Sequence, residues 1–194
     1  DEHLNDKWSL ETDTAFYFLT MNAGSGNLRL VPTSFTLPSS LTPDPYFIHT
    51  VGKYYREKYH QGRAEIVGDY VFSSNYERGE GFTTTDIGTN ATRTETYINL
   101  SPYNGPGAPS PVVKVNAAGY ALSPRTVEVK VNGTIVSNTV MDFFDYVKIS
   151  QTINVSDISS GTAVIDVRNA CLNTGDRMVI AQSELIYARQ FNFG

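Results

Sequence analysis

The 194-residue sequence has little cysteine, tryptophan or positive charge. Its single cysteine, Cys171, excludes an internal disulfide and a cysteine-based zinc site. The 15 Lys and Arg residues against 20 Asp and Glu residues give a formal net charge of -5, with no basic cluster to neutralise phosphates. We therefore expect neither a nucleic-acid partner nor a polybasic membrane-surface site.

Long apolar runs are also missing. No run approaches the roughly 20 residues that a membrane-spanning helix needs, so no membrane insertion is expected. The first residues, Asp1 to Leu4, show no basic region followed by an apolar segment, and we expect no signal peptide in this chain. Residues 1–7 are polar and are expected to form an extended lead-in. The lack of a disulfide favours a bacterial protein, or a domain that does not need a disulfide, over a secreted eukaryotic domain.

The residues that are abundant favour β-structure. The chain has 12 Tyr and 10 Phe together with much Thr and Val, and these residues favour sheet over helix. The clearest local pattern runs over 127–136, where valines at 127, 129 and 131 alternate with Glu128 and Lys130. This period of two is typical of a half-buried strand. Asn132-Gly133 then favours a tight hairpin turn, because both residues tolerate positive φ.

Similar apolar segments recur along the chain. From residue 112 onward, strands are predicted at short, regular intervals, over 112–117, 126–131, 134–140, 146–153, 162–169 and 178–187. Earlier strands are expected at 14–21, 28–31, 45–51 and 63–72. One short helix is predicted over 53–61, where Tyr55 and Tyr59 are four residues apart. We predict an all-β, jelly-roll-like antiparallel β-sandwich with little helix.

The segment 101–111 is rich in Pro and Gly and is the sharpest change of composition in the chain. We expect one β-sandwich unit over 1–194, in which this segment connects a strand-rich part, 1–100, to a jelly-roll-like half, 112–194. A domain boundary at the same segment is the alternative.

Few residues point to chemistry. Cys171 follows an apolar strand, and we expect it to be a small buried side chain rather than a nucleophile. The histidines at 3, 49 and 60 are too far apart in sequence to indicate a metal site by spacing. Asp142, Asp145 and Asp157 flank predicted strands and are the candidate ligands for a calcium ion, the one cofactor considered. Alternatively, they are solvated carboxylates in turns.

Two further groups of residues are candidate sites. Glu77 and Glu80 lie near aromatic residues, but two glutamates in a Gly-rich loop do not fix the carboxyl separation that a glycosidase needs. We therefore expect no enzyme activity, with a hydrolase as the third hypothesis. Exposed tyrosines could stack on a sugar, and the candidates are Tyr54, Tyr55, Tyr59 and Tyr76. Their alternative role is to pack an edge of the sandwich.

Several separated tracts occur in an order that resembles a known family. They are an early strand over 15–21 with a return at 26–30, a Gly-rich tract over 74–82, a strand that ends at 131–133, and a last strand over 183–191. The residues that carry the likeness are Gly79, Glu80, Gly81, Phe82, Asn132, Gly133, Tyr187 and Arg189. This order resembles the β-sandwich region that precedes the catalytic domain in gingipain-like cysteine peptidases of Bacteroidetes, including the sortase-like peptidase of the type IX secretion system. Phe82 stands where that family prefers tryptophan.

The resemblance implies a non-catalytic accessory domain of a larger bacterial protein that is secreted or surface-associated. Its location would be extracellular or at the outer-membrane surface, and its partner an adjacent protein domain. The family's catalytic histidine and cysteine lie in a following domain, outside these residues, so the resemblance implies no peptidase activity here. The alternative from a different class is a free-standing carbohydrate-binding module, with the tyrosine face as its site and a glycan as its partner.

Overall fold

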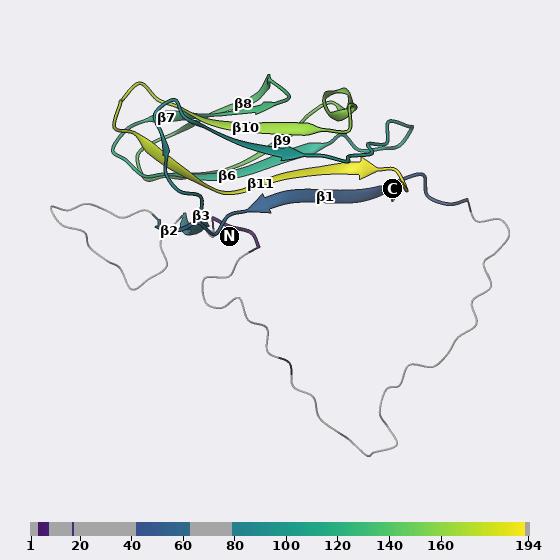
Figure 1. Ribbon diagram of the computed structural model, residues 1–194, viewed down its shortest axis with the longest axis horizontal. Helices are drawn as coiled ribbons and strands as arrows, with labels where there is room; N and C mark the ends of the chain where they lie inside the picture. The colour runs from purple at the N-terminus through teal and green to yellow at the C-terminus, as the bar shows by residue number, and fades with distance from the viewer. Residues whose placement is uncertain (1–3, 8–16, 18–41, 63–78, 193–194) are drawn as a thin grey trace, which may run out of the picture.

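The computed structural model describes residues 4–7, 17, 42–62 and 79–192 (Figure 1). These residues form strands and one short 3-10 helix. The elements are β1 (Phe47–Tyr54), β2 (Lys58–Gln61), β3 (Glu80–Thr83), β4 (Ile87–Gly88), β5 (Thr92–Tyr97), β6 (Val112–Gly119), β7 (Arg125–Val131), β8 (Thr134–Met141), β9 (Tyr146–Thr152), η1 (Val155–Ile158), β10 (Ala163–Ala170) and β11 (Arg177–Arg189). Within these ranges, no helix is long and apolar enough to cross a membrane.

Two antiparallel sheets face each other. One has the order β1-β11-β6-β9, with β4 paired to the start of β11, and the other has the order β5-β10-β7-β8. Figure 1 shows these sheets as two layers, with the small β2-β3 pair at one end. From β5 onward, every connection except the β7–β8 hairpin passes from one sheet to the other. This is a jelly roll, so the predicted all-β antiparallel sandwich is confirmed.

The hairpin predicted from Asn132-Gly133 is present between β7 and β8. Asn132 has φ 47° and Gly133 has φ 84°, so both turn residues take the left-handed conformation that a tight hairpin requires. The alternating valines of β7 are buried between the sheets, where they meet core residues of β6 and β10 such as Val115 and Ile165. Cross-sheet packing of these apolar faces is what holds the two layers together.

The long strand β11 changes its inward face at a bulge. The register between β11 and β6 shifts between Ile180 and Gln182. Before the bulge, Met178 and Ile180 enter the core, and after it Leu185 and Tyr187 do so. The extra residue in a bulge inverts the alternation, so one strand can follow the twist of the sheet and still fill the core along its whole length.

The outer face of this sheet is partly covered by residues 4–7. Leu4 is 0% exposed and packs with Ala118, Val179 and Ala181. Asn5 donates a hydrogen bond through Nδ2 to the Ala181 carbonyl oxygen, at 3.1 Å. The expectation of a purely polar lead-in is therefore wrong for Leu4, because the small side chains beneath it leave room for one apolar residue.

The helix predicted over 53–61 is also wrong. β1 continues to Tyr54, and β2 occupies 58–61. In β2 the side chains alternate, with His60 buried between the exposed Tyr59 and Gln61. The spacing between Tyr55 and Tyr59 therefore does not reflect one helix face, because Tyr55 enters the core while Tyr59 faces outward.

The other strand predictions divide into two groups. β1 and the strands β6 to β11 correspond to segments predicted as strands, with ends that differ by a few residues. The predicted strands at 28–31 and 63–72 lie outside the described residues, as does the one at 14–21 apart from Tyr17. β1 and β5, which precede the segment 101–111, pair with β11 and β10, which follow it. The described strands before and after this segment therefore share one core.

Candidate functional site

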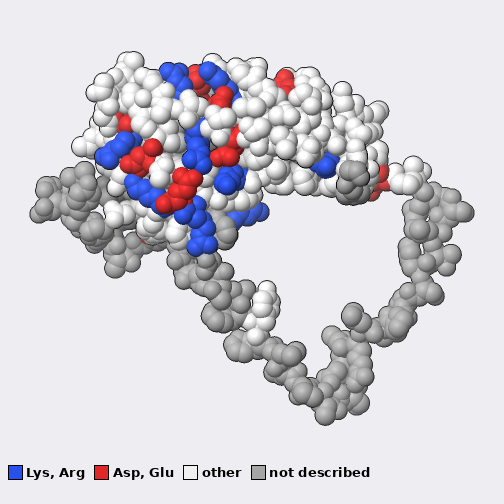
Figure 2. Space-filling view, in the orientation of Figure 1, with Lys and Arg blue, Asp and Glu red and all other residues white. Residues whose placement is uncertain are grey.

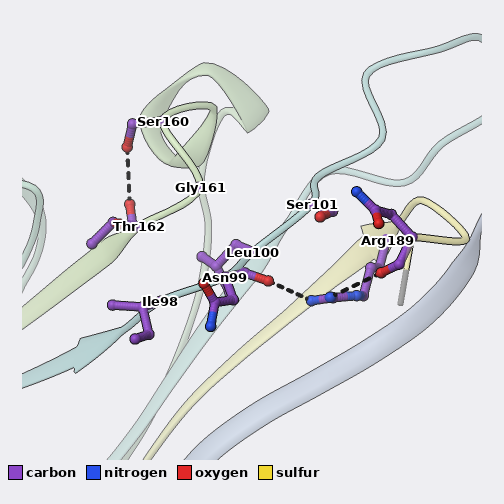
Figure 3. Close-up of a pocket in the computed structure, with 9 residues that line it drawn as sticks. Ile98, Asn99, Leu100, Ser101, Ser160, Gly161, Thr162 and Arg189 are labelled. Atoms are coloured by element: carbon purple, nitrogen blue, oxygen red, sulfur yellow. Dashed lines mark hydrogen bonds between the residues drawn. The ribbon is translucent and has the colours of Figure 1, made fainter. Parts of the chain in front are cut away.

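A pocket of about 650 Å³ lies at the end of the sandwich where β5 and β11 finish and β10 begins (Figure 3). We call it the end pocket. It is lined by Ile98, Asn99, Leu100, Ser101, Ser160, Gly161, Thr162, Arg189 and Asn192. An adjoining pocket of about 360 Å³ shares part of this lining and extends along Pro102, Asn104, Val155, Ser159 and Gln190.

Backbone hydrogen bonds hold the loops around the end pocket. The Leu100 amide donates to the Gly161 carbonyl oxygen at 3.0 Å, and the Gln190 amide donates to that of Ser101 at 2.8 Å. Gly161 has φ 80°, and a Cβ there would lie 3.1 Å from the Leu100 carbonyl oxygen, so this close approach favours glycine. The pocket is therefore built on a fixed backbone rather than on free loops.

Arg189, the last residue of β11, reaches into the end pocket (Figure 3). Its Nη1 donates to the Asn99 carbonyl oxygen at 2.8 Å and to the Tyr187 hydroxyl at 2.9 Å. Its Nη2 donates to the Asn192 carbonyl oxygen at 3.3 Å. All three acceptors are neutral, so the guanidinium is held in one orientation while its charge is not cancelled by them.

Aromatic side chains gather beside Arg189. Phe47 lies opposite Arg189 in the β1–β11 register. The ring of His49 meets the Tyr187 ring edge-on, with centroids 5.6 Å apart. We call the group the aromatic cluster, which comprises Tyr46, Phe47, His49, Tyr103, Tyr187 and Phe191. Burial lowers the pKa of His49, and the positive charge of Arg189 lowers it further, so Arg189 carries the charge of this region at neutral pH.

The lining of the end pocket limits its chemistry. Hydroxyls, amides, backbone groups and one guanidinium face it, and none of the described residues in its lining is Asp, Glu, His or Cys. General acid–base catalysis usually needs a titratable group within hydrogen-bond reach of substrate. These groups are instead suited to hold a polar ligand through several hydrogen bonds.

The predicted tyrosine face does not form at this pocket. Tyr55 is 1% exposed and donates its hydroxyl to Glu95 at 2.9 Å, so its ring cannot stack on a ligand. Tyr54 is half-buried and donates to Glu184 on the outer face of the first sheet. Tyr59 is 43% exposed and packs edge-on against Phe82. Tyr76 lies outside the described residues.

The three candidate calcium ligands are not brought together. Asp142 and Asp145 lie in the β8–β9 loop, where the Asp145 amide donates to the Asp142 carbonyl oxygen at 2.8 Å. Asp157 lies in η1, and its carbonyl oxygen accepts a hydrogen bond from Asn132, in the turn at the opposite end of β8. No group of three or more His, Cys, Asp or Glu side chains suited to a metal ion occurs in the described ranges. The expected calcium site is thus not assembled from these carboxylates.

Apart from Arg189, the residues that carry the family resemblance do not line the end pocket. Glu80, Gly81 and Phe82 belong to β3, and Gly79 immediately precedes it. Tyr187 is buried, and its hydroxyl accepts a hydrogen bond from Arg189. Glu77, the partner proposed for Glu80 in a hydrolase, lies outside the described residues, as does His3.

A buried ion pair occupies the opposite end of the sandwich and was not predicted from the sequence. Arg125 contacts both carboxylate oxygens of Asp176, at 2.8 and 2.7 Å, and both side chains are fully buried. Asn169 donates to the same carboxylate at 2.8 Å. Burial alone would raise the pKa of Asp176, but hydrogen bonds from Arg125 and Asn169 outweigh it and lower the pKa. The pair lies 51 positions apart in sequence, so no local motif announces it.

Two other reactive side chains are enclosed. Cys171 is buried, as predicted, and its Sγ lies 3.3 Å from the Pro124 carbonyl oxygen. His60 is buried beside Tyr120, with ring centroids 5.2 Å apart. Neither side chain lines the end pocket or the adjoining pocket.

Comparison with known proteins gives structural neighbours of low identity. No family model and no curated protein matches the sequence. One neighbour is dimeric latent PorU from Porphyromonas gingivalis, with 13% identity over 76% of this chain and a TM-score of 0.49, although the chain spans only 13% of that protein. Another is the CBM36-1 domain of a multidomain xylanase from the hindgut metagenome of Trinervitermes trinervoides (11% identity, 72% and 96% coverage of this chain and that one, TM-score 0.40). A third is a family 35 carbohydrate-binding module from Clostridium thermocellum, with 15% identity over 70% of this chain and 97% of that chain and a TM-score of 0.36. Similarity at this level assigns no function to the chain.

Proposed function

We propose that the chain is a non-catalytic accessory β-sandwich of a larger secreted or surface-associated bacterial protein, and that it binds a glycan in the end pocket. The observation that carries this proposal is the pocket lining, whose described residues offer hydroxyl, amide and guanidinium groups without a carboxylate, histidine or thiol side chain. Sugar hydroxyls both donate and accept hydrogen bonds, and Ser, Thr and Asn side chains can match either role.

The surroundings of the pocket also support glycan binding. Its loops are fixed by backbone hydrogen bonds, so little conformational entropy is lost when a ligand is held there. The aromatic cluster lies directly beside Arg189 and includes the stacked pair Tyr46–Tyr103, with centroids 5.2 Å apart. Aromatic rings next to convergent polar groups are typical of sites for amphipathic ligands.

The test measures binding of the whole chain to a panel of soluble polysaccharides by affinity electrophoresis and calorimetry. Asn99→Gly removes one amide side chain from the pocket and tolerates the positive φ of 58° at this position. We expect this variant to weaken binding, whereas Tyr59→Ala should leave it unchanged. Loss of binding in Tyr59→Ala alone would instead assign the site to the tyrosine face, and no binding to any polysaccharide would refute the proposed function.

A second candidate function, docking against an adjacent protein domain, is favoured by exposed apolar side chains at the same end. Ile48, Ile98 and Phe191 are more than half exposed there. Exposed apolar groups near each other often mark protein contacts. Ile98→Ser should weaken binding of this chain to an adjacent domain of the larger protein, measured by calorimetry with the two parts expressed separately. Leu172→Ser is the matched control, because Leu172 is 99% exposed in the β10–β11 loop at the opposite end. Equal effects of the two variants would exclude docking through Ile98.

A further inference from the structure

The charge of Arg189 suggests which glycans the end pocket selects. Resting on the glycan binding proposed above, we infer that the pocket recognises sugars that carry an anionic substituent, a carboxylate or a sulfate, and that Arg189 binds this substituent.

Arg189 differs from other arginines of the protein in its partners. Arg93, Arg125, Arg168 and Arg177 each form an ion pair with a carboxylate, at distances between 2.7 and 3.6 Å. Arg189 instead donates to two carbonyl oxygens and one hydroxyl. Hydrogen bonds to these neutral groups orient the guanidinium but leave its positive charge uncompensated.

The guanidinium retains capacity for a ligand. Of the five N–H donors of an arginine, the described contacts use three, on Nη1 and Nη2. Nε and one Nη2 hydrogen remain for other acceptors. Two N–H groups of a planar guanidinium match the oxygen spacing of a carboxylate or a sulfate, and such charge-assisted bonds are stronger than neutral ones.

The surroundings preserve this charge although the chain as a whole is acidic. Among the residues that the structure describes, no Asp or Glu lines the end pocket or the adjoining pocket. Figure 2 shows acidic and basic side chains interleaved over one half of the visible face, and few of either sign toward the end where β11 finishes. The described lining of the two pockets therefore offers an anionic ligand one positive charge and no carboxylate side chain that would repel it.

The neighbouring groups account for the sugar part of the ligand. Ser101, Ser160 and Thr162 lie around Arg189 in the pocket lining, and Figure 3 shows Ser160 and Thr162 on the loop across from it. A substituent held on Arg189 would place the attached ring among these hydroxyls. The arrangement thus combines one charged contact for selectivity with neutral contacts for the ring.

The test compares three forms of one glucan oligosaccharide: neutral, with primary alcohols oxidised to carboxylates, and sulfated. Affinities of the whole chain are measured by calorimetry at low and high salt. At least one anionic form should bind about tenfold tighter than the neutral form or better, since a charge-assisted hydrogen bond typically contributes that much. Salt should reduce this preference by screening. The form that binds tighter identifies carboxylate or sulfate as the substituent.

Variants assign the preference to Arg189. Arg189→Gln should abolish the preference for the anionic form, and Arg189→Lys should retain part of it, because a lysine keeps the charge without the fork. Arg168→Gln is the matched control and should keep the preference, because Arg168 lies on β10 away from the pocket. Thermal unfolding shows whether each variant is folded.

His49 provides a readout that needs no variant. Because Arg189 contributes to the lowered pKa of His49, an anion bound to Arg189 should raise that pKa, as followed by NMR, and the neutral sugar should not. Equal affinity for neutral and anionic forms, with the pKa of His49 unchanged, would overturn the inference and leave the proposed glycan binding intact. No binding of any form, together with no binding to any polysaccharide of the panel, would overturn both proposals. Tight binding of an unrelated carboxylate-terminated peptide with no sugar binding would do the same.

Discussion

Arg125 and Asp176 carry opposite charges in a fully buried position, at the end of the sandwich away from the end pocket. Arg125 also donates to the carbonyl oxygens of Phe143 and Ala121, at 2.6 and 3.0 Å. One side chain therefore joins the loops that follow β6, β8 and β10. Two charges removed from water stabilise a fold only when each finds its partners, and here both do.

Asp176→Asn leaves the Arg125 charge buried without a counter-ion. We expect the free energy of unfolding to fall by about 3 to 5 kcal/mol, which urea denaturation measures. Asp166→Asn is the control, because Asp166 contacts Thr94 on the outer face of the second sheet and should contribute about 1 kcal/mol at most. Similar small losses in both variants would contradict a structural role for the ion pair.

His60 links stability to pH. Burial lowers its pKa, so the folded protein keeps this imidazole neutral at pH values where the unfolded chain is already protonated. The unfolded state then binds more protons than the folded state, and stability is lost as pH falls below about 6.5. The lowered pKa of Asp176 acts in the same direction but at lower pH, below about 4.

Urea unfolding between pH 8 and pH 5 tests the role of His60. The free energy of unfolding should decrease with falling pH by at most about 1.4 kcal/mol per pH unit from this group. His60→Gln should flatten the profile, while His49, whose pKa is also lowered, remains in both proteins. Parallel stability profiles of the parent protein and His60→Gln would show that His60 does not cause the pH dependence. An NMR titration of the His60 ring protons in the native protein tests the lowered pKa directly.

Some strands and turns can be predicted from the local sequence pattern, and others cannot. β7 and its turn were predicted because Val127, Val129 and Val131 alternate and Asn132-Gly133 directly follows them. The helix over 53–61 was wrong because two tyrosines four apart fit a helix, while the alternation of β2 covers only four residues. Short strands give too few residues for the period of two to be decisive.

Glycine at 133 should be required for the β7–β8 hairpin. Gly133→Ala forces a Cβ into a backbone with φ 84°, and we expect a loss of about 1 kcal/mol or more in unfolding free energy. Gly88→Ala is the matched control, because Gly88 has no positive φ and an added Cβ would meet nothing within 4 Å. A Gly133→Ala variant as stable as Gly88→Ala would show that the turn tolerates a side chain.

For the whole molecule, the end pocket combines segments that are distant in sequence. Its lining comes from 98–101, 160–162 and the end of β11. Sequence patterns report the neighbours of a residue along a strand, but not which loops meet after the sheets stack. The sequence marks Arg189 only as a motif residue. Its pairing opposite Phe47 of β1 brings it to the aromatic cluster, and the stacking of the two sheets brings it to Asn99 in the loop after β5. The tyrosines selected for spacing and composition are instead spread over the core and two surfaces.

Segments that are distant in sequence also meet on the outer face of the first sheet, where the start of the described chain contacts β6, β9 and β11. Asp6 pairs with Lys148 at 2.8 Å and accepts a hydrogen bond from Gln182 at 2.7 Å. Asn116 donates to the Leu4 carbonyl oxygen at 2.8 Å. These contacts place Leu4 over the small side chains of the sheet, where an apolar residue is removed from water.

Leu4→Ala tests whether this cover contributes to the stability of the whole sandwich. If it does, the variant loses about 2 to 5 kcal/mol of unfolding free energy, the range for a buried leucine truncated to alanine. Leu172→Ala is the control at a fully exposed leucine and should change stability by about 0.5 kcal/mol or less. Should the two variants unfold at the same urea concentration, residues 4–7 would rest on the sheet without stabilising it. A loss confined to Leu4→Ala would show that a residue distant in sequence from β6 and β11 belongs to the cooperative fold.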